Sequence, residues 1–111
     1  MMGRRLDRQV HVLAPVTEKT ATGNTRVVGT QEVLRAAASY EPLSDGERWR
    51  AGAVEQKAEA RFVLGYSARA AAVTGAHVLR FEGADWEITG TKVIGRRRWI
   101  EITAWKIRKE E

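Results

Sequence analysis

The fold is decided by the stretch from Tyr40 to Tyr66, YEPLSDGERWRAGAVEQKAEARFVLGY. It contains the end of one apolar strand, the segment that follows it, and the next apolar strand. Pro42 holds the residue before it in an extended conformation, so we expect the first strand to end there. From Phe62 onward, large apolar residues recur at every second position, which is the period of a strand. A charged segment with one tryptophan therefore separates two core strands.

The middle of this stretch has the pattern of a short helix. Ser44 and Glu47 have the spacing of a capping box, in which the hydroxyl accepts from a backbone amide and the carboxylate reaches back to the cap. Beyond the cap, Trp49 and Ala53 form an apolar stripe that is too thin for a core helix. We therefore expect a projecting, partly helical excursion.

Before this stretch, the sequence predicts strands joined by a long polar hairpin. Val10–Ala14 alternates and should end at Pro15, because proline cannot donate a hydrogen bond to a sheet. Thr17–Thr25 is small, polar and centred on a glycine, as a hairpin tip would be. Val27–Val33 is ambiguous, with a return strand as one interpretation. Leu34–Tyr40 is a firm strand, and its small central side chains would let a barrel close tightly.

After this stretch, short strands and turn signals continue. Ser67–Ala76 is rich in alanine and suits a helical turn. Val78–Phe81 and Trp86–Thr89 should pair across the short connection between them. Gly90 then breaks the alternation as a bulge would. An arginine-rich turn leads to the last strand, Trp99–Ile107.

About six short strands, tight turns and one short helix or loop excursion predict a mainly all-β protein. The architecture we expect is a small β-barrel, closed or nearly closed. Closure would also remove the edges that short strands otherwise expose. With 111 residues the chain is expected to form a single domain, residues 1–111, from which 44–57 projects.

Composition narrows the classes of function. The content of 43% hydrophobic and 30% charged residues is typical of a globular protein, and the absence of cysteine excludes disulfides and cysteine-based metal sites. No apolar run approaches the roughly 18 residues that cross a bilayer, and the basic N-terminus lacks the apolar region of a signal peptide, so no membrane partner is expected. The net charge of +5 favours anionic partners, although the bases are dispersed among acids.

The last strand has apolar residues on both faces. Ile100, Ile102 and Ala104 share one face, whereas Trp105 and Ile107 belong to the other. Two explanations remain open. The outer face contacts another subunit, or it is covered by the N-terminal arm or the alanine-rich link of the same chain.

The residues that carry chemistry are sparse, and we predict no catalytic, cofactor or metal site. His11 and His77 have no second ligand at metal-binding spacing. Asp85 and Glu87 suit a turn and a solvated strand face better than acid–base catalysis. No serine lies in a nucleophile motif, and the glycines at 23 and 29 do not form a phosphate-binding loop.

The order of these weak motifs resembles that of the head-tail joining proteins of long-tailed phages, which are also called head-closure or stopper proteins. The similarity begins with LDRQVHVLAPV, continues through YEPLS, GERWRAGAVEQ and ARFVLGY, and ends with VLRFEGADWEITG and RRRWIEITAWKI. It covers roughly Arg4 to Ile107. Prophages and gene-transfer particles also carry such proteins.

The resemblance implies a small barrel, assembly into a homo-oligomeric ring, a dodecamer in the particle, and a connecting segment that helps to close the central channel. The gating residues would be Ser44, Glu47, Arg48, Trp49, Arg50, Glu55 and Lys57. Contacts between subunits or rings would be made by Arg4, Arg5, Thr22, Gly23, Asn24, Arg96, Arg97, Arg98, Trp105 and Ile107.

The same resemblance implies portal and adaptor proteins above the ring, tail-terminator proteins below it, and non-specific proximity to double-stranded DNA in the channel. The protein would be present in the host cytoplasm during assembly and then in the neck of the virion or gene-transfer particle. The alternative is a small basic barrel that binds single-stranded nucleic acid. It would stack bases on Trp86, Trp99 and Trp105 and contact phosphates through Arg96–Arg98.

Overall fold

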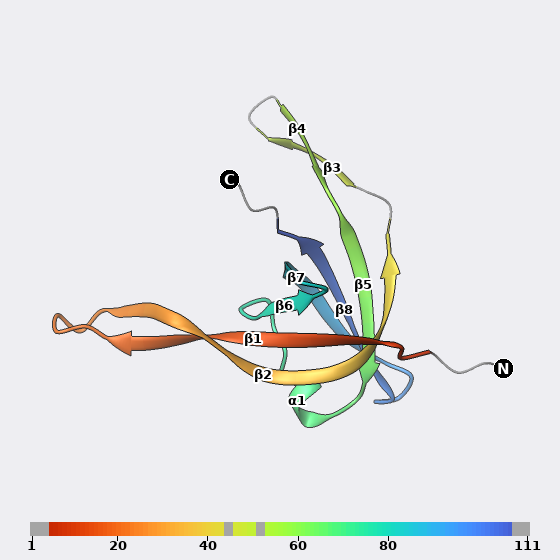
Figure 1. Ribbon diagram of the computed structural model, residues 1–111, viewed down its shortest axis with the longest axis horizontal. Helices are drawn as coiled ribbons and strands as arrows, with labels where there is room; N and C mark the ends of the chain where they lie inside the picture. Colours follow the sequence, from red (N-terminus) through yellow and green to blue (C-terminus); the bar gives the residue numbers. More distant parts are fainter. Residues whose placement is uncertain (1–4, 44–45, 51–52, 108–111) are drawn as a thin grey trace.

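The computed structural model describes residues 5–43, 46–50 and 53–107, and within 46–57 it describes the backbone only. Six antiparallel strands pair in a closed circle, which confirms the all-β class and the small closed barrel (Figure 1). In order around the barrel they are β1 (Arg8–Lys19), β2 (Thr25–Pro42), β5 (Glu59–Gly65), β8 (Trp99–Lys106), β7 (Ala84–Ile94) and β6 (Val78–Phe81). No helix in this described part of the chain is long and apolar enough to cross a membrane.

Side chains fill the interior of the barrel, so it is a packed core rather than a channel. Alternate residues of each strand point inward, and on β8 these are Ile100, Ile102 and Ala104, as the sequence predicts. Phe62 is fully buried, and its ring meets those of Phe81 and Trp86 edge to face, at centroid distances of 5.1 and 5.4 Å. Aromatic pairs in this arrangement add to the stabilisation that burial itself provides.

β1 and β2 are longer than the sequence indicates. β1 continues through Pro15 to Lys19, because its pairing with β6 ends at Leu13 and a proline is tolerated once that side of the strand is open. The predicted Thr17–Thr25 loop is shorter in the structure, because residues 17–19 belong to β1, Thr25 begins β2, and residues 20–24 form the turn. The threonines and valines of this region are β-branched residues that favour strands, and the ambiguous Val27–Val33 is part of β2.

The predicted helix after Pro42 is wrong. Its place is taken by a β-hairpin of β3 (Gly46–Arg50) and β4 (Ala53–Lys57), and Ser44 of the supposed capping box lies outside the described residues. The physical reason is that the two residues that flank this segment lie side by side in the barrel. Pro42 and Ala60 are paired neighbours in β2 and β5, so a segment that leaves one and enters the other continues readily as an antiparallel pair. An isolated helix of this length would also be marginal without a surface to pack on.

The remaining elements follow the sequence closely. α1 (Ala68–Ala71) is a single helical turn in the alanine-rich link, capped by Ser67, whose Oγ accepts from the Ala70 amide at 3.0 Å. The β6–β7 connection is shorter than predicted, with Glu82 and Gly83 as its two residues, both at positive φ. The predicted bulge near Gly90 is present, and it is Thr89 that has no partner in the register.

Candidate assembly surfaces

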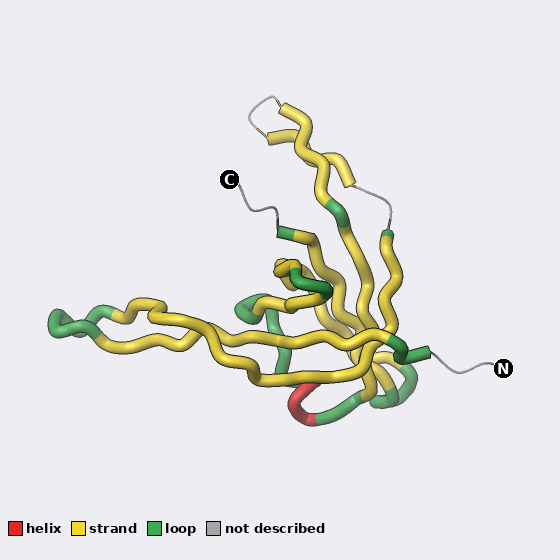
Figure 2. The backbone as a smooth tube through the Cα atoms, viewed as in Figure 1, coloured by secondary structure: helices red, strands yellow, loops and turns green. Residues whose placement is uncertain are grey.

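Two hairpins leave the barrel in different directions. The far half of the β1–β2 pair extends as a two-stranded ribbon, and the β3–β4 hairpin rises from the end of the barrel where β2 stops and β5 begins (Figures 1 and 2). With these projections the molecule measures 57 × 39 × 24 Å. Surfaces that reach so far from the core are suited to contact with other molecules.

The ribbon carries the predicted contact residues Thr22, Gly23 and Asn24 at its tip, and all three are exposed. The turn is closed by the Thr20 amide, which donates to the Asn24 carbonyl at 2.7 Å, and Gly23 adopts the positive φ of 85° that a glycine permits. Sequence reasoning missed the apolar residues behind this tip. Val27 is 64% exposed and Val28 48% exposed, beside a register shift in the pairing of the ribbon.

A charged cluster lies where the ribbon leaves the barrel. The His11 ring and the Glu32 carboxylate share a hydrogen bond, and Arg35 lies 3.3 Å from the other oxygen of Glu32. These contacts, with that of His11 the largest, lower the pKa of Glu32 from its ordinary value. β2 has an extra residue here, Val33, which bends the strand away from the wall. Local sequence patterns do not indicate this cluster, because His11 and Glu32 are 21 positions apart.

The β3–β4 hairpin holds the predicted gating residues other than Ser44, which lies outside the described residues. The described backbone places Glu47, Arg48, Trp49 and Arg50 on β3 and Glu55 and Lys57 on β4. Arg48 lies opposite Glu55, and Trp49 lies opposite Val54. The structure thus gathers this group on one projecting element, although the element is extended rather than helical. The gating role itself stays a prediction.

Arg96, Arg97 and Arg98 are exposed together in the turn between β7 and β8. The turn is closed by the Arg98 amide, which donates to the Ile94 carbonyl at 3.2 Å. Gly95, Arg96 and Arg97 all have positive φ, at 65°, 55° and 64°. Arg5 is also exposed, near the start of β1, whereas Arg4 lies outside the described residues. The structure does not bring these basic residues, the ribbon tip and β3–β4 into one site.

On the outer face of β8, Trp105 is half-buried and Ile107 is 41% exposed. Trp105 lies in register between Glu59 of β5 and Glu87 of β7. α1 packs against β2, at a different part of the barrel wall. The interface role of Trp105 and Ile107 stays a prediction.

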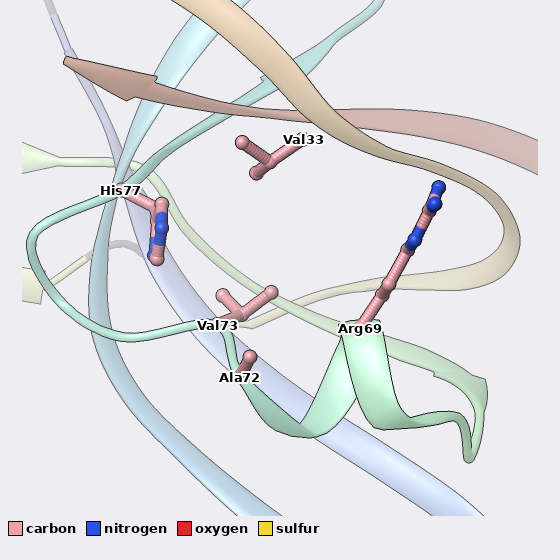
Figure 3. A pocket seen from close by; sticks show the side chains of 5 residues that line it. All are labelled: Val33, Arg69, Ala72, Val73 and His77. Atoms are coloured by element: carbon pink, nitrogen blue, oxygen red, sulfur yellow. The ribbon is translucent and has the colours of Figure 1, made fainter. Parts of the chain in front are cut away.

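The pocket beneath the ribbon base contains no arrangement that we recognise as catalytic. It has a volume of about 260 Å³ and lies between the bulge of β2 and the segment after α1 (Figure 3). His77 points into it, and its Nδ1 accepts from the Thr74 amide at 3.0 Å. The described residues include no group of three or more histidine, aspartate or glutamate side chains that could hold a metal ion.

Asp85 forms an ion pair with Arg80 at 2.8 Å and raises the pKa of that guanidinium.

The base-stacking surface of the nucleic-acid alternative is not formed. Trp86 is only 4% exposed, inside the barrel, whereas Trp99 and Trp105 lie on the outer face of β8. The three tryptophans therefore do not line a common groove, and this removes the main structural reason for that alternative.

A family model described as "Phage head completion protein" matches residues 1–108. The chain belongs to the phage head completion protein family. The fold of this head completion protein is also similar to a chain in a solved structure of the virion of a native gene transfer agent particle. The TM-score is 0.72 and the identity 16%, over 95% of this chain and 98% of that one. No curated protein sequence matches the chain.

Proposed function

We propose that this head completion protein is a structural connector that forms a homo-oligomeric ring below the portal and adaptor. The ring closes the DNA-filled head and provides the site where the tail attaches. The observation that carries the proposal is the β3–β4 hairpin, which projects from one end of a small, fully packed barrel. Because the barrel interior is filled, a passage for DNA requires several copies around a common axis. Family membership supports a structural rather than a catalytic role.

In this ring the β3–β4 hairpins point toward the axis and narrow the channel. The hairpin carries Arg48 and Arg50 on β3 and Lys57 on β4, so this arrangement brings three basic residues close to the DNA. Contacts of this kind hold phosphates without reading sequence. A hairpin is also a suitable gate, because its backbone hydrogen bonds are satisfied internally and it can move as a unit.

The β1–β2 ribbon reaches beyond the barrel toward adjoining proteins, with the portal and adaptor on one side of the ring and the tail terminator on the other. Its exposed Val27 and Val28 offer apolar contact area, and its polar tip carries exposed backbone and hydroxyl groups. We propose a dodecamer in the particle. Weak contacts per copy then add around the ring. The protein is made in the host cytoplasm and ends in the neck of the virion or gene-transfer particle.

The proposal is tested by removing the β3–β4 hairpin and, separately, the tip of the β1–β2 ribbon. Residues 46–57 are replaced by a short glycine–serine link, which the fold should accept because the Leu43 amide already donates to the Glu59 carbonyl at 2.8 Å. Particles with this variant should assemble the ring but lose packaged DNA from filled heads. In the matched variant, residues 20–24 are replaced by a two-residue turn, and these particles should retain DNA but fail to join tails. If particles without β3–β4 keep their DNA and deliver it normally, the gating role is wrong.

A further inference from the structure

The turn between β7 and β8 holds three cations that have no acidic partner among the described side chains. Arg96, Arg97 and Arg98 are exposed, and none forms an ion pair with any side chain in the described part of the chain. Several exposed cations elsewhere on the barrel and ribbon are matched with carboxylates, namely Arg8, Arg26, Arg35, Arg61, Arg80 and Lys92. Arg5, Lys19 and Arg69 also lack an ion pair among the described residues, but they are scattered along the chain. Three consecutive arginines with no carboxylate beside them favour a partner molecule that brings its own carboxylates.

The backbone holds these arginines in place. Arg96 and Arg97 both occupy the left-handed region, which is unfavourable for a residue with a side chain. Gly95 precedes them at positive φ, and a Cβ there would lie 3.2 Å from Trp99 Cδ1, so the indole packs closely over the start of the turn. A turn under this strain and packing holds the arginine backbone in one conformation, which lowers the entropy lost on binding.

Aromatic residues border the turn. The Tyr66 amide donates to the Arg98 carbonyl at 3.0 Å, and Tyr66 is 38% exposed. Trp99 is half-buried and follows the turn directly. Arginine, tyrosine and tryptophan are the residues that most often dominate protein–protein contacts. The composition of this surface, Tyr66 with Gly95–Trp99, is thus that of an interface and not only of a soluble turn.

The position of the surface distinguishes a protein ligand from DNA. Gly65 pairs with Trp99 at one end of the β5–β8 ladder, whereas Glu59 pairs with Trp105 at the other, beside the origin of β3–β4. The arginine turn therefore lies at the end of the barrel away from the β3–β4 hairpin (Figure 1). This inference rests on the proposed function, in which the β3–β4 hairpin faces the DNA. The arginine turn, at the opposite end of the barrel, then faces away from the channel.

We propose that Tyr66 and Gly95–Trp99 form a docking surface for the acidic face of a neighbouring protein in the particle. The planar guanidinium groups of Arg96–Arg98 pair with its carboxylates, two parallel hydrogen bonds to each, and Tyr66 and Trp99 exclude water at the border. A compact group of three arginines on one turn suits a localised set of carboxylates. Phosphates spaced along a DNA duplex are better matched by a longer basic track.

The first test uses the isolated full chain and needs no ring. Isotope-labelled protein is titrated with hexaglutamate and, separately, with a 12-base-pair DNA duplex, and NMR shifts are followed for residues 66 and 95–99, including the Trp99 indole N–H. Hexaglutamate should shift these signals first. The R96E/R97E/R98E variant should weaken its binding at least fivefold, and the R96K/R97K/R98K variant should weaken it by a smaller factor, since lysine keeps the charge but not the paired hydrogen bonds.

The matched control has the same net charge but reverses unpaired cations elsewhere, R5E/K19E/R69E, and it should weaken hexaglutamate binding less than twofold. If both charge-reversed variants lost the same amount of affinity for hexaglutamate, the proposal would be overturned. Such a result would show that binding depends on the overall charge and not on a site at this turn. Tighter binding of the DNA duplex than of hexaglutamate at residues 95–99 would also overturn it in favour of a phosphate site. Wild-type-like amide spectra of the variants without ligand confirm that they are folded.

The second test uses particles and separates this inference from the proposed function. The R96E/R97E/R98E variant should stop joining of one neighbouring component, and compensating changes from acid to lysine should restore joining when placed in that component. If the variant particles are fully functional while particles without this protein fail, the docking surface is wrong and the connector function stands. If particles without the protein are normal, the connector function is wrong, and the NMR titration still decides whether the surface binds carboxylates.

Discussion

The barrel and the ribbon are continuous in β1 and β2, yet they treat apolar side chains in opposite ways. Within the barrel, Val10 and Val12 of β1 are completely buried, whereas farther along the same hairpin Val27 and Val28 are 64% and 48% exposed. The strands are alike in backbone and differ only in what covers them. The difference separates the side chains that stabilise the fold from exposed side chains that the fold does not need, so each set can be changed without the other.

The largest effect should come from the aromatic core. Phe62→Ala removes a fully buried ring that contacts Phe81 and Trp86, and the cavity left behind should cost about 3–5 kcal/mol in the free energy of unfolding. Since small domains are stable by only about 5–15 kcal/mol, urea unfolding should show a protein close to its limit. Val27→Ala on the ribbon is the control and should stay within about 0.5 kcal/mol of the wild type. If both variants lost the same free energy of unfolding, the ribbon would be packed like the barrel, and the contrast between barrel and ribbon would not hold.

A smaller loss of stability is expected in the arginine turn. Gly95→Ala places a Cβ at positive φ and 3.2 Å from both Trp99 Cδ1 and Arg98 Cβ, so it should cost about 1–3 kcal/mol in thermal or urea unfolding. Gly29→Ala is the matched control on the ribbon, because that position has open space and no positive φ. It should be neutral or slightly stabilising. A neutral Gly95→Ala would mean that the turn is not held rigidly, and it would weaken the docking proposal as well.

Much of the barrel could be predicted from the sequence because its signals are local. The alternation in Trp99–Ile107 assigns the buried face of β8 correctly, and the alanines of Leu34–Tyr40 identify a wall of the barrel. Glycine near the bulge of β7 is a local signal too. These patterns depend on burial, which repeats with the period of the strand.

The errors occurred where partners distant in sequence decide the structure. The capping-box spacing of Ser44 and Glu47 favoured a helix, but the pairing of β2 with β5 placed both ends side by side and made a hairpin. Pro15 predicts the end of a strand, because the sequence cannot show that the pairing of β1 with β6 ends at Leu13. Nor can the sequence show that Arg96–Arg98 lack an ion pair within the described part of the chain, since this depends on where the carboxylates lie.

Altering the ribbon surface should leave the fold intact and disrupt assembly. V27K/V28K replaces two exposed apolar side chains with charged ones, and the free energy of unfolding should change by no more than about 0.5 kcal/mol. Under the proposed function, particles carrying this variant should fail to join their neighbouring components, as electron microscopy of purified particles would show. Normal joining, with the same small change in stability, would mean that these valines are exposed without a role.

The smallest effect concerns the cluster at which ribbon and barrel meet. The hydrogen bond from His11 lowers the pKa of Glu32 most, and Arg35 adds to the shift. Because the folded-state pKa lies below the ordinary value of 4.5, the stabilisation by this carboxylate is fully present above that pH and is lost as the pH falls through the lower, folded value. An NMR titration of the Glu32 side-chain carbon should show its pKa rising toward the ordinary value in His11→Gln, and by less in Arg35→Gln. Lys19→Gln, farther along the ribbon, should leave it unchanged. If all three variants titrate like the wild type, the charges at the base do not interact in solution, and the junction is held by strand pairing and the Val33 bulge alone.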